Sequence, residues 1–311
     1  MTDVIHVDAA RLADLVSPEA AIAAVRQAFL GLVRGDFDLP HRLSLGAGAA
    51  LVMPVHHIPS GETVIKSLSV NFDRAPAISG STLWMSASSE RVLVIDAGAL
   101  TAIRTGAVVA VATDVLAAKD ASGLCIIGAG AQSFHQVQSI AAVRQLQRVV
   151  VVDVDPTRSR SLADRLRRTL GPDVEVTTAP TPTQGVGGMG LVCCATTSLT
   201  PLFELAALTP DVHVNAIGAY RRDMAELGPD VLSAASVIVV DQLAAAMDEA
   251  GDIIRYVEMG AVSPDRFTEL GTLLTSTAAP RIGMTIFKSV GLAIQDWAVA
   301  SLVARRLDLA G

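Results

Sequence analysis

Residues 128–133 have the sequence Gly-Ala-Gly-Ala-Gln-Ser and lie between a strand-like apolar run and a helix-like run. The first glycine, Gly128, allows a tight turn, and Gly130 lets the backbone approach a pyrophosphate. The start of the following helix offers unpaired N–H groups and a partial positive charge. Ser133 departs from the pattern, which has Gly or Ala at that position. The spacing predicts that Gly128 and Gly130 bind a dinucleotide.

An acidic residue, Asp153, closes the next apolar run, 23 residues after Gly130. A carboxylate at this distance suits a hydrogen bond to the ribose 2′-hydroxyl of NAD and repels the extra phosphate of NADP. Arg158 and Arg160 follow closely, and either could reach a 2′-phosphate. The sequence therefore favours NAD(H) as the cofactor and leaves NADP(H) open.

Arg104 lies inside the apolar helical run Ala99–Ala112. An unpaired charge buried there would cost several kcal/mol, so we expect an anion to meet it, such as a substrate carboxylate or a cofactor phosphate. Arg42 and Lys66 also have apolar or small neighbours, although either, taken alone, could be an ordinary surface charge.

The composition excludes several classes of function. The chain has 311 residues, 51% of them hydrophobic, and a net charge of −7, which disfavours a nucleic-acid partner. Three Cys and six His show no metal-ligand spacing, so we expect no metal. No run of 18 apolar residues and no signal-peptide pattern appears, which predicts a cytoplasmic protein that does not bind a membrane.

The elements that must position these residues follow from the hydrophobic pattern. A short strand and a helix from Pro18 precede short strands over 40–95, and a long helix is expected over 99–118. Apolar strands then alternate with helices over 132–143 and 158–170, which predicts a parallel sheet covered on both faces. The expected strands are 124–127, 148–152, 174–176, 191–195, 212–217 and 237–240. The last segment, Phe287–Leu307, is predicted to be helical, without a further strand, and to pack on the N-terminal half.

In this order, the motifs resemble the ornithine cyclodeaminase/μ-crystallin family along nearly the whole chain. The residues that carry the resemblance are Met53-Pro54, Lys66-Ser67, Leu100–Ala107, Ile127–Ser133, Asn215–Ala219, Glu226-Leu227 and Phe287–Asp296.

The resemblance implies an α/β protein with a Rossmann dinucleotide-binding domain and a second α/β domain formed by both chain ends. We place the Rossmann domain at residues 119–284 and the substrate-binding and dimerisation domain at residues 1–118 with 285–311. Members of the family act on α-amino or α-imino acids with a nicotinamide cofactor, so a small imino or amino acid and a second copy of the chain are the expected partners.

The resemblance also implies roles for individual residues. Arg42, Lys66 and Arg104 match the residues that hold the substrate carboxylate, and Val290 matches a residue that lines the substrate pocket. Lys66 and Arg104 are the predicted catalytic residues. The cofactor positions, which include Arg104 and the two glycines, are completed by Ala131, Gln132, Asp153, Thr196, Ile217, Gly218 and Ser289.

One departure from the family bears on the reaction. The cyclodeaminases have an Asp two residues after Gly218, where this chain has Tyr220, and Asp223 follows three residues further on. Cyclisation needs a carboxylate that deprotonates the attacking amine, and a tyrosine with a pKa of about 10 is a poor base at neutral pH. Reductases and μ-crystallin-like members of the family also lack that Asp.

The leading hypothesis is therefore NAD(P)H-dependent reduction of a cyclic ketimine, such as Δ1-pyrroline-2-carboxylate or Δ1-piperideine-2-carboxylate, to an L-amino or imino acid. In this hypothesis Arg42 and Arg104 clamp the carboxylate, and Lys66 donates or orients the proton. Three alternatives stay open: an amino-acid dehydrogenase of the alanine or opine type, an ornithine or lysine cyclodeaminase, and a μ-crystallin-like ligand binder without activity.

Overall fold

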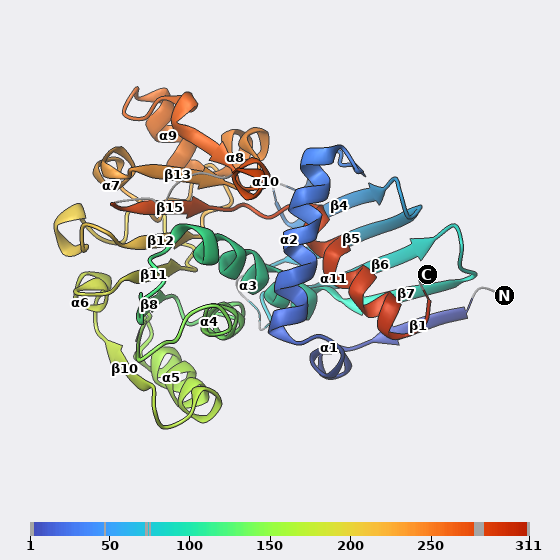
Figure 1. The fold of residues 1–311 in the computed structure, drawn as a ribbon, viewed down its shortest axis with the longest axis horizontal. Helices are drawn as coiled ribbons and strands as arrows, with labels where there is room; N and C mark the ends of the chain where they lie inside the picture. Colours follow the sequence, from blue (N-terminus) through green and yellow to red (C-terminus); the bar gives the residue numbers. More distant parts are fainter. Residues whose placement is uncertain (1–2, 47, 72–73, 75, 277–282, 310–311) are drawn as a thin grey trace. The chain divides into compact units, whose positions relative to one another are not determined.

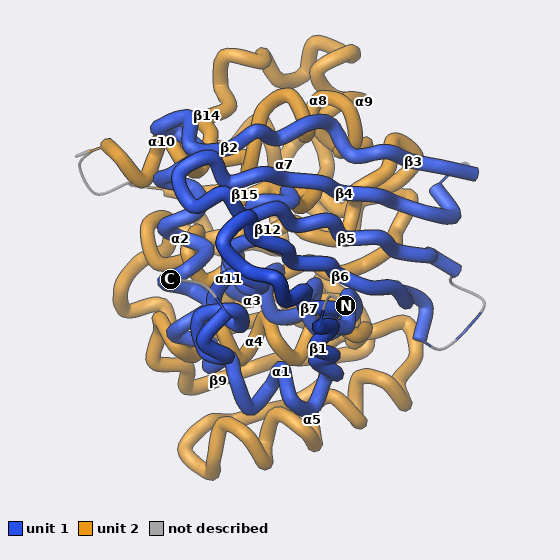
Figure 2. The backbone as a smooth tube through the Cα atoms, turned by 90° about the vertical axis from the view of Figure 1, so that its right-hand side faces the viewer, with its two compact units in different colours: residues 1–108, 292–311 blue, residues 109–291 orange. Residues whose placement is uncertain are grey.

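The computed structural model describes residues 3–46, 48–71, 74, 76–276 and 283–309, and the chain divides into two compact units (Figures 1 and 2). Unit 1 comprises residues 1–108 and 292–311, and unit 2 comprises residues 109–291. Unit 1 thus joins the two ends of the chain. The predicted domain boundaries, at 118/119 and 284/285, differ from the limits of these two units and stay a prediction.

Unit 1 is built around a seven-stranded, mostly antiparallel sheet in the order β1-β7-β6-β5-β4-β2, with β3 also paired to β4. Its strands are β1 (Asp3–Val7), β2 (Phe37–Asp38), β3 (Leu43–Leu45), β4 (Ala50–His57), β5 (Glu62–Val70), β6 (Ile78–Ser86) and β7 (Arg91–Asp96). Its helices are α1 (Ala9–Leu15), α2 (Pro18–Arg34) and α11 (Ala293–Arg306). The pairing of β1 with β7 is parallel, and the other described pairings in this sheet are antiparallel.

Side chains alternate across this sheet because successive strand residues point to opposite faces. On one face Met53, Val64, Trp84 and Leu93 are buried, and the helices α2 and α11 lie over the sheet (Figure 1). Helix α2 begins as predicted, with Ser17 accepting a hydrogen bond from the Ala20 N–H and proline in the first turn. This packing confirms the prediction that the C-terminal helix joins the N-terminal half.

The long helix α3 (Ala97–Leu116) contains the boundary between the units. Among the described residues it is the one unbroken helix long and apolar enough to cross a membrane, but 83% of its most apolar window is buried inside the protein. Such burial is typical of a core helix.

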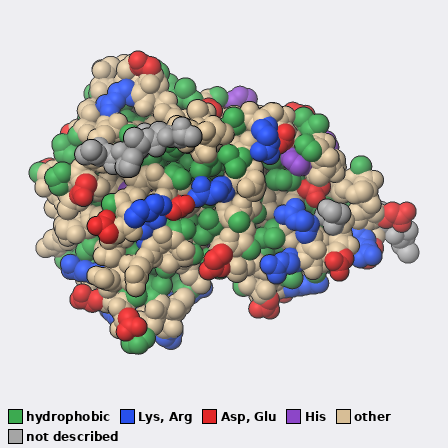
Figure 3. Space-filling view, in the orientation of Figure 1, with side chains coloured by type: hydrophobic (Ala, Val, Ile, Leu, Met, Phe, Trp, Pro, Cys, Tyr) green, Lys and Arg blue, Asp and Glu red, His purple; other side chains and the backbone are tan. Residues whose placement is uncertain are grey.

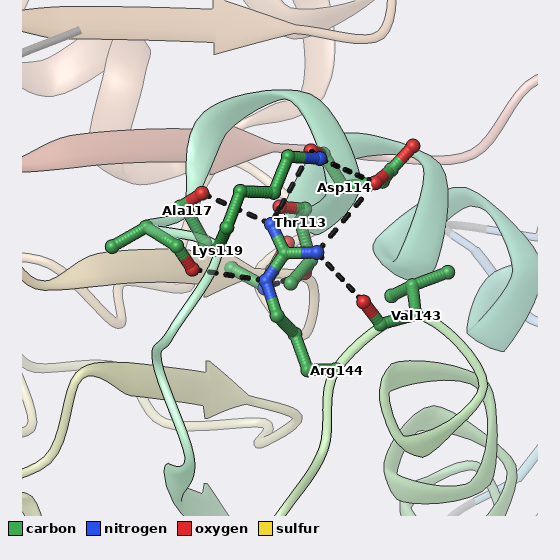
Figure 4. Close-up of polar contacts among 8 residues, drawn as sticks. Thr113, Asp114, Ala117, Lys119, Val143 and Arg144 are labelled. Atoms are coloured by element: carbon green, nitrogen blue, oxygen red, sulfur yellow. Dashed lines mark hydrogen bonds and ion pairs between the residues drawn. The ribbon is translucent and has the colours of Figure 1, made fainter. Parts of the chain in front are cut away.

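The C-terminal end of α3 is capped by a buried arginine from the segment after α4. The Arg144 guanidinium donates hydrogen bonds to the carbonyls of Thr113, Ala117 and Ala118 at 2.7–3.0 Å (Figure 4). These carbonyls belong to the last turn of α3 and the residues after it, where helical partners run out. Arg144 therefore fixes the end of α3 within unit 2.

Unit 2 contains an eight-stranded, fully parallel sheet in the order β10-β9-β8-β11-β12-β15-β13-β14. The strands are β8 (Gly123–Ile127), β9 (Arg148–Val152), β10 (Glu175–Ala179), β11 (Leu191–Cys194), β12 (His213–Ala216), β13 (Val237–Val240), β14 (Phe267–Glu269) and β15 (Thr285–Lys288). The helices are α4 (Ser133–Ala141), α5 (Pro156–Leu170), α6 (Pro182–Val186), α7 (Pro229–Ala234), α8 (Leu243–Glu249), α9 (Gly251–Glu258) and α10 (Leu270–Thr275).

This sheet confirms the predicted Rossmann architecture and the α/β fold class. The strand order reverses between β8 and β11, and ligands of such sheets bind at the carboxyl ends of the strands beside this reversal. We call this carboxyl edge the cofactor edge of unit 2.

The prediction of a wholly helical segment over Phe287–Leu307 is wrong at its start. Thr285–Lys288 forms β15, inserted between β12 and β13, and α11 begins only at Ala293. A strand of four residues is too short to show a period of two, and a lysine at its end looks like the polar face of a helix. In the fold the Lys288 ammonium is buried and lies 3.1 Å from the Asp252 carboxylate, which compensates its charge.

Charged side chains of both signs are interspersed over the face drawn in Figure 3.

Candidate functional site

A buried ion pair lies under the sheet of unit 1. Lys66, on β5, is fully buried, and its Nζ lies 2.8 Å from Oδ1 and 2.7 Å from Oδ2 of Asp296 on α11. Lys66 pairs across the sheet with Met53 and Thr82 and faces the helix layer because of the strand alternation. A lysine buried this deeply is stable only with a compensating charge, which Asp296 supplies.

Arg104 joins the same carboxylate from α3. Its Nε lies 3.2 Å from Asp296 Oδ1, and its Nη1 donates a 2.6 Å hydrogen bond to Gln295 Oε1. Only 7% of Arg104 is exposed. The anion expected from its burial is thus, in part, a protein carboxylate. The structure brings Lys66 and Arg104 together through Asp296.

Positive charge exceeds negative charge in this cluster. Burial, followed by the positive charges of Arg104 and Arg42, lowers the pKa of Lys66 to about 7 against the opposing effect of Asp296. Arg42, which precedes β3 and is partly exposed, therefore acts on Lys66 electrostatically. Three cationic side chains thus act around one carboxylate, which favours the binding of an added anion.

Several buried polar atoms near the cluster form no hydrogen bond within the described part of the chain. Arg104 Nε, although within ion-pair distance of Asp296, lacks hydrogen-bond geometry, and the Gln295 Nε2 group has no acceptor. The buried hydroxyls of Thr82, Thr101 and Thr105 also have no hydrogen-bond partner among the described residues. Buried polar groups normally have hydrogen-bond partners, so these atoms are available for hydrogen bonds to a polar ligand.

The glycine turn of unit 2 has the geometry that a pyrophosphate requires. Gly128 has φ of 94°, and a Cβ there would collide with the Ala195 carbonyl. Gly130 and Ala131 are exposed, and a Cβ on Gly130 would meet no atom within 4 Å, which leaves room for a ligand. Ser133 donates a 2.7 Å hydrogen bond to the Gly128 carbonyl, so its hydroxyl braces the turn. Gln132 precedes α4 as its N-cap residue.

Asp153 follows β9 beside this turn. Its Oδ2 accepts a 2.6 Å hydrogen bond from the Ala129 N–H, and its Oδ1 accepts a 2.8 Å bond from the Asp155 N–H. The carboxylate is therefore oriented by backbone on both sides while it stays part-exposed. Arg158 and Arg160 are exposed on α5. These features fit a dinucleotide whose ribose approaches Asp153.

The other predicted cofactor residues follow three neighbouring strands. Thr196 comes after β11, Ile217 and Gly218 after β12, and Ser289 and Val290 after β15. Since these strands are parallel, the residues share the cofactor edge with Gly128 and Asp153. The structure thus assembles the predicted cofactor residues of unit 2 on one edge, whereas Arg42, Lys66 and Arg104 belong to unit 1.

Sequence reasoning assigned no role to the acids that organise both sites. In unit 2 the fully buried Asp241 accepts hydrogen bonds from Ser289 Oγ and from the N–H groups of Val290 and Gly291 at 2.7–2.9 Å. Glu226 serves the loops after β11 and β12 in a similar way. In unit 1 Asp296 contacts Lys66 and Arg104, and Gln295 accepts a hydrogen bond from Arg104. A polar pair opening an otherwise apolar helix was the available signal for those two.

The residues at the place of the cyclodeaminase Asp are engaged elsewhere in unit 2. Tyr220 packs against the hydrophobic core of this unit. Asp223 forms a two-point ion pair with Arg221, with distances of 3.1 and 3.0 Å, and its side chain is 59% exposed. Both oxygens of Asp223 are thus occupied by a surface arginine. No group of three or more potential metal ligands occurs in the described ranges.

Comparisons with known proteins agree with these features. A model of the ornithine cyclodeaminase/mu-crystallin family matches residues 9–309. Δ1-Pyrroline-2-carboxylate reductase of Bacillus cereus is 33% identical over 223 residues, which cover 70% of this chain and 68% of that protein. Ketimine reductase mu-crystallin of Mus musculus is 31% identical over 230 residues, 73% of this chain and 69% of that protein.

A solved structure is similar over nearly the full length. Δ1-Pyrroline-2-carboxylate reductase of Thermococcus litoralis, in complex with NADH and L-proline, superposes with a TM-score of 0.91 at 27% identity, and the match covers 99% of each chain.

Proposed function

This chain belongs to the ornithine cyclodeaminase/mu-crystallin family, and from that premise we propose that it reduces a cyclic ketimine whose C=N bond lies next to a carboxylate, with NAD(P)H as the reductant. The observation that carries the proposal is the buried cluster of Lys66, Arg104 and Asp296, with its excess of positive charge. The B. cereus, mouse and T. litoralis relatives are named for reductions of this class.

Recognition of the substrate begins with its carboxylate. Arg104 has an Nε without a hydrogen-bond partner, and Arg42 adds positive charge. A guanidinium binds a carboxylate through two parallel hydrogen bonds, which fixes its orientation as well as its position. We assign Arg104 and Arg42 to this clamp.

Reduction of C=N also needs a proton on nitrogen, and Lys66 is the group suited to supply it. With a pKa of about 7, Lys66 is partly protonated at neutral pH, whereas an ordinary lysine releases its proton far less readily. Asp296 orients the ammonium through a hydrogen bond to its Oδ1, and its Oδ2 lies within ion-pair distance. When bound, the nicotinamide cofactor supplies the hydride.

NADH is the proposed cofactor, with NADPH as the second choice. Gly128 and Gly130 leave room for the pyrophosphate, and Asp153 presents a part-exposed carboxylate suited to a ribose hydroxyl. The T. litoralis structure contains NADH. Δ1-Pyrroline-2-carboxylate is the substrate that we favour, and L-proline the product.

The test is a panel of imino and keto acids with NADH and with NADPH, in the presence and absence of ammonium. We expect NADH oxidation with Δ1-pyrroline-2-carboxylate or Δ1-piperideine-2-carboxylate that does not depend on ammonium. Ammonium-dependent reduction of pyruvate would instead favour an amino-acid dehydrogenase. Ammonia release from ornithine without net NADH consumption would favour a cyclodeaminase, and saturable binding without turnover would indicate a ligand binder.

We further propose that the protein is a cytoplasmic homodimer. Its three cysteines are free and buried, as suits a reducing compartment. In unit 1 Pro54, Ile65, Leu83 and Val94 form a cross-strand row on the sheet face opposite α2 and α11, and all four stay part-exposed. A second copy would cover this apolar row.

Sedimentation equilibrium tests the dimer. Ile65→Arg should shift the protein toward monomer, whereas Val33→Arg, at a 47% exposed position on α2, should not. A monomeric wild-type protein would contradict the proposal.

A further inference from the structure

Glu226 connects two loops at the cofactor edge of unit 2. The residue is fully buried. Its Oε1 accepts hydrogen bonds from Thr196 N at 2.7 Å and Thr196 Oγ1 at 2.9 Å. Its Oε2 accepts from Gly218 N at 2.7 Å and Ala219 N at 3.2 Å. One carboxylate thus holds the loop after β11 and the loop after β12 at the same time.

The contacts of Glu226 favour an ionised carboxylate. Burial raises the pKa of Glu226, while the N–H groups of Thr196 and Gly218 and the charge of Lys288 act in the opposite direction. Three of the four bonds come from backbone N–H groups, which can only donate. A protonated Glu226 could therefore give its proton only to the Thr196 hydroxyl, whose own proton would then have to turn away from Glu226.

Its charge is also not balanced by the neighbouring ion pair. Lys288 lies 3.1 Å from Asp252 and forms a fully buried pair with it. The Glu226 N–H, and not its carboxylate, contacts Asp252, at 3.4 Å. The local sum over Glu226, Asp252 and Lys288 is therefore one net negative charge.

Glycine at position 218 is part of the same arrangement. A Cβ there would collide with the backbone of Thr196 and with Glu226 Oε1. The two loops consequently touch without an intervening side chain. A larger residue would push them apart and break the bonds to Glu226.

The two loops lie where the second half of a Rossmann sheet receives the nicotinamide end of the dinucleotide. The nicotinamide ring is positively charged when oxidised and neutral when reduced. We propose that Glu226 is a positioning residue that fixes the loops around Thr196 and Gly218 for the nicotinamide end, and that its negative charge favours the oxidised cofactor over the reduced one. This proposal rests on the proposed function only in requiring that the chain bind a nicotinamide dinucleotide.

Two substitutions separate position from charge. Glu226→Gln keeps the length but removes the charge, and its amide would face the N–H groups of one loop. Glu226→Asp keeps the charge but is too short to reach both loops. Glu175→Gln is the matched control, since it removes the same charge from unit 2 at the first residue of β10, which lies at the amino edge of the sheet.

The experiment measures the dissociation constants of NADH, by its fluorescence, and of NAD⁺, by calorimetry, for the purified full-length proteins. Glu226→Gln should weaken NAD⁺ roughly tenfold more than NADH, the effect that one nearby charge has on another. Glu226→Asp should weaken both forms alike. Glu175→Gln should change neither the affinities nor their ratio.

An unchanged NAD⁺ to NADH ratio in Glu226→Gln would overturn the electrostatic part, and wild-type affinities in Glu226→Asp would overturn the positioning part. Should Glu226→Gln fail to fold, Glu226→Asp still tests the positioning. Because binding is measured without an imine, the affinities for NADH and NAD⁺ still test the role of Glu226 if the proposed reaction is not observed. A wild-type protein that binds neither form would contradict both proposals.

Discussion

The Lys66 ammonium lies 2.8 and 2.7 Å from the two oxygens of Asp296, a residue 230 positions later in the chain. Both are fully buried. The pair joins a strand from the N-terminal half to the helix that closes the chain. The reactivity assigned to Lys66 is thus set by a residue from the other end of the sequence.

Replacing Asp296 by Asn should move the pH dependence of imine reduction to lower pH. If the Lys66 ammonium donates the proton, the rate falls as pH rises through its pKa of about 7. Asp296 stabilises the ammonium, so its removal lowers that pKa further, and the fall should begin roughly one pH unit earlier. The measurement is kcat against pH with saturating NADH and imine.

Glu62→Gln is the control for this prediction. Glu62 is another buried acid of unit 1, and it accepts hydrogen bonds from Trp297 Nε1 and Ser301 Oγ on α11, at 2.7 and 2.6 Å. Its substitution should lower stability without moving the pH midpoint. A midpoint that moves equally in both variants would mean that packing of α11, and not the Asp296 charge, sets the profile.

Arg104→Ala should reduce kcat/KM for the imine roughly a hundredfold or more, since it removes the proposed carboxylate clamp. Arg104→Lys keeps the charge but loses the two-point geometry, so an intermediate loss is expected. Arg91→Ala, at an exposed arginine of β7, should leave kcat/KM near the wild-type value. Steady-state kinetics with varied imine would show this, and a near-wild-type Arg104→Ala would remove Arg104 from the site.

Local patterns in the sequence were sufficient for much of the fold. The glycine turn at 128–133 and the apolar runs on either side of it depend on neighbouring residues, so the alternating strands and helices could be read directly. Arg104 was recognisable because a charge stood inside an apolar helical run.

Partners of buried charges could not be predicted in the same way. Which acid meets Arg104 and Lys66 is decided by the packing of α11 under the sheet, and no local pattern encodes that choice. The same holds for Lys288, whose pairing with Asp252 makes a lysine tolerable in a buried strand. For this reason β15 looked helical, and Asp296 was not predicted to pair with Lys66 and Arg104.

Asp153→Ser should raise the preference for NADPH relative to NADH. Loss of the carboxylate removes its repulsion of a 2′-phosphate, so the ratio of kcat/KM values should shift toward NADPH by about tenfold. Both affinities should also fall, because the Ala129 N–H loses its acceptor. Asp155→Ser is the control, since serine can still cap α5. An unchanged ratio in Asp153→Ser would contradict the assigned role in cofactor choice.

Arg144→Ala should destabilise the protein by roughly 2–4 kcal/mol, because it leaves several buried carbonyls at the end of α3 without a donor. Arg144 itself is 4% exposed, so water cannot easily replace its guanidinium. Thermal and chemical unfolding would measure the loss. Arg148→Ala is the matched control. The Arg148 side chain is 53% exposed, and its ion pair with Glu175 is long, at 3.9 Å, so a change within about 0.5 kcal/mol is expected. Equal losses in the two variants would show that the cap of α3 is not a special contribution to stability.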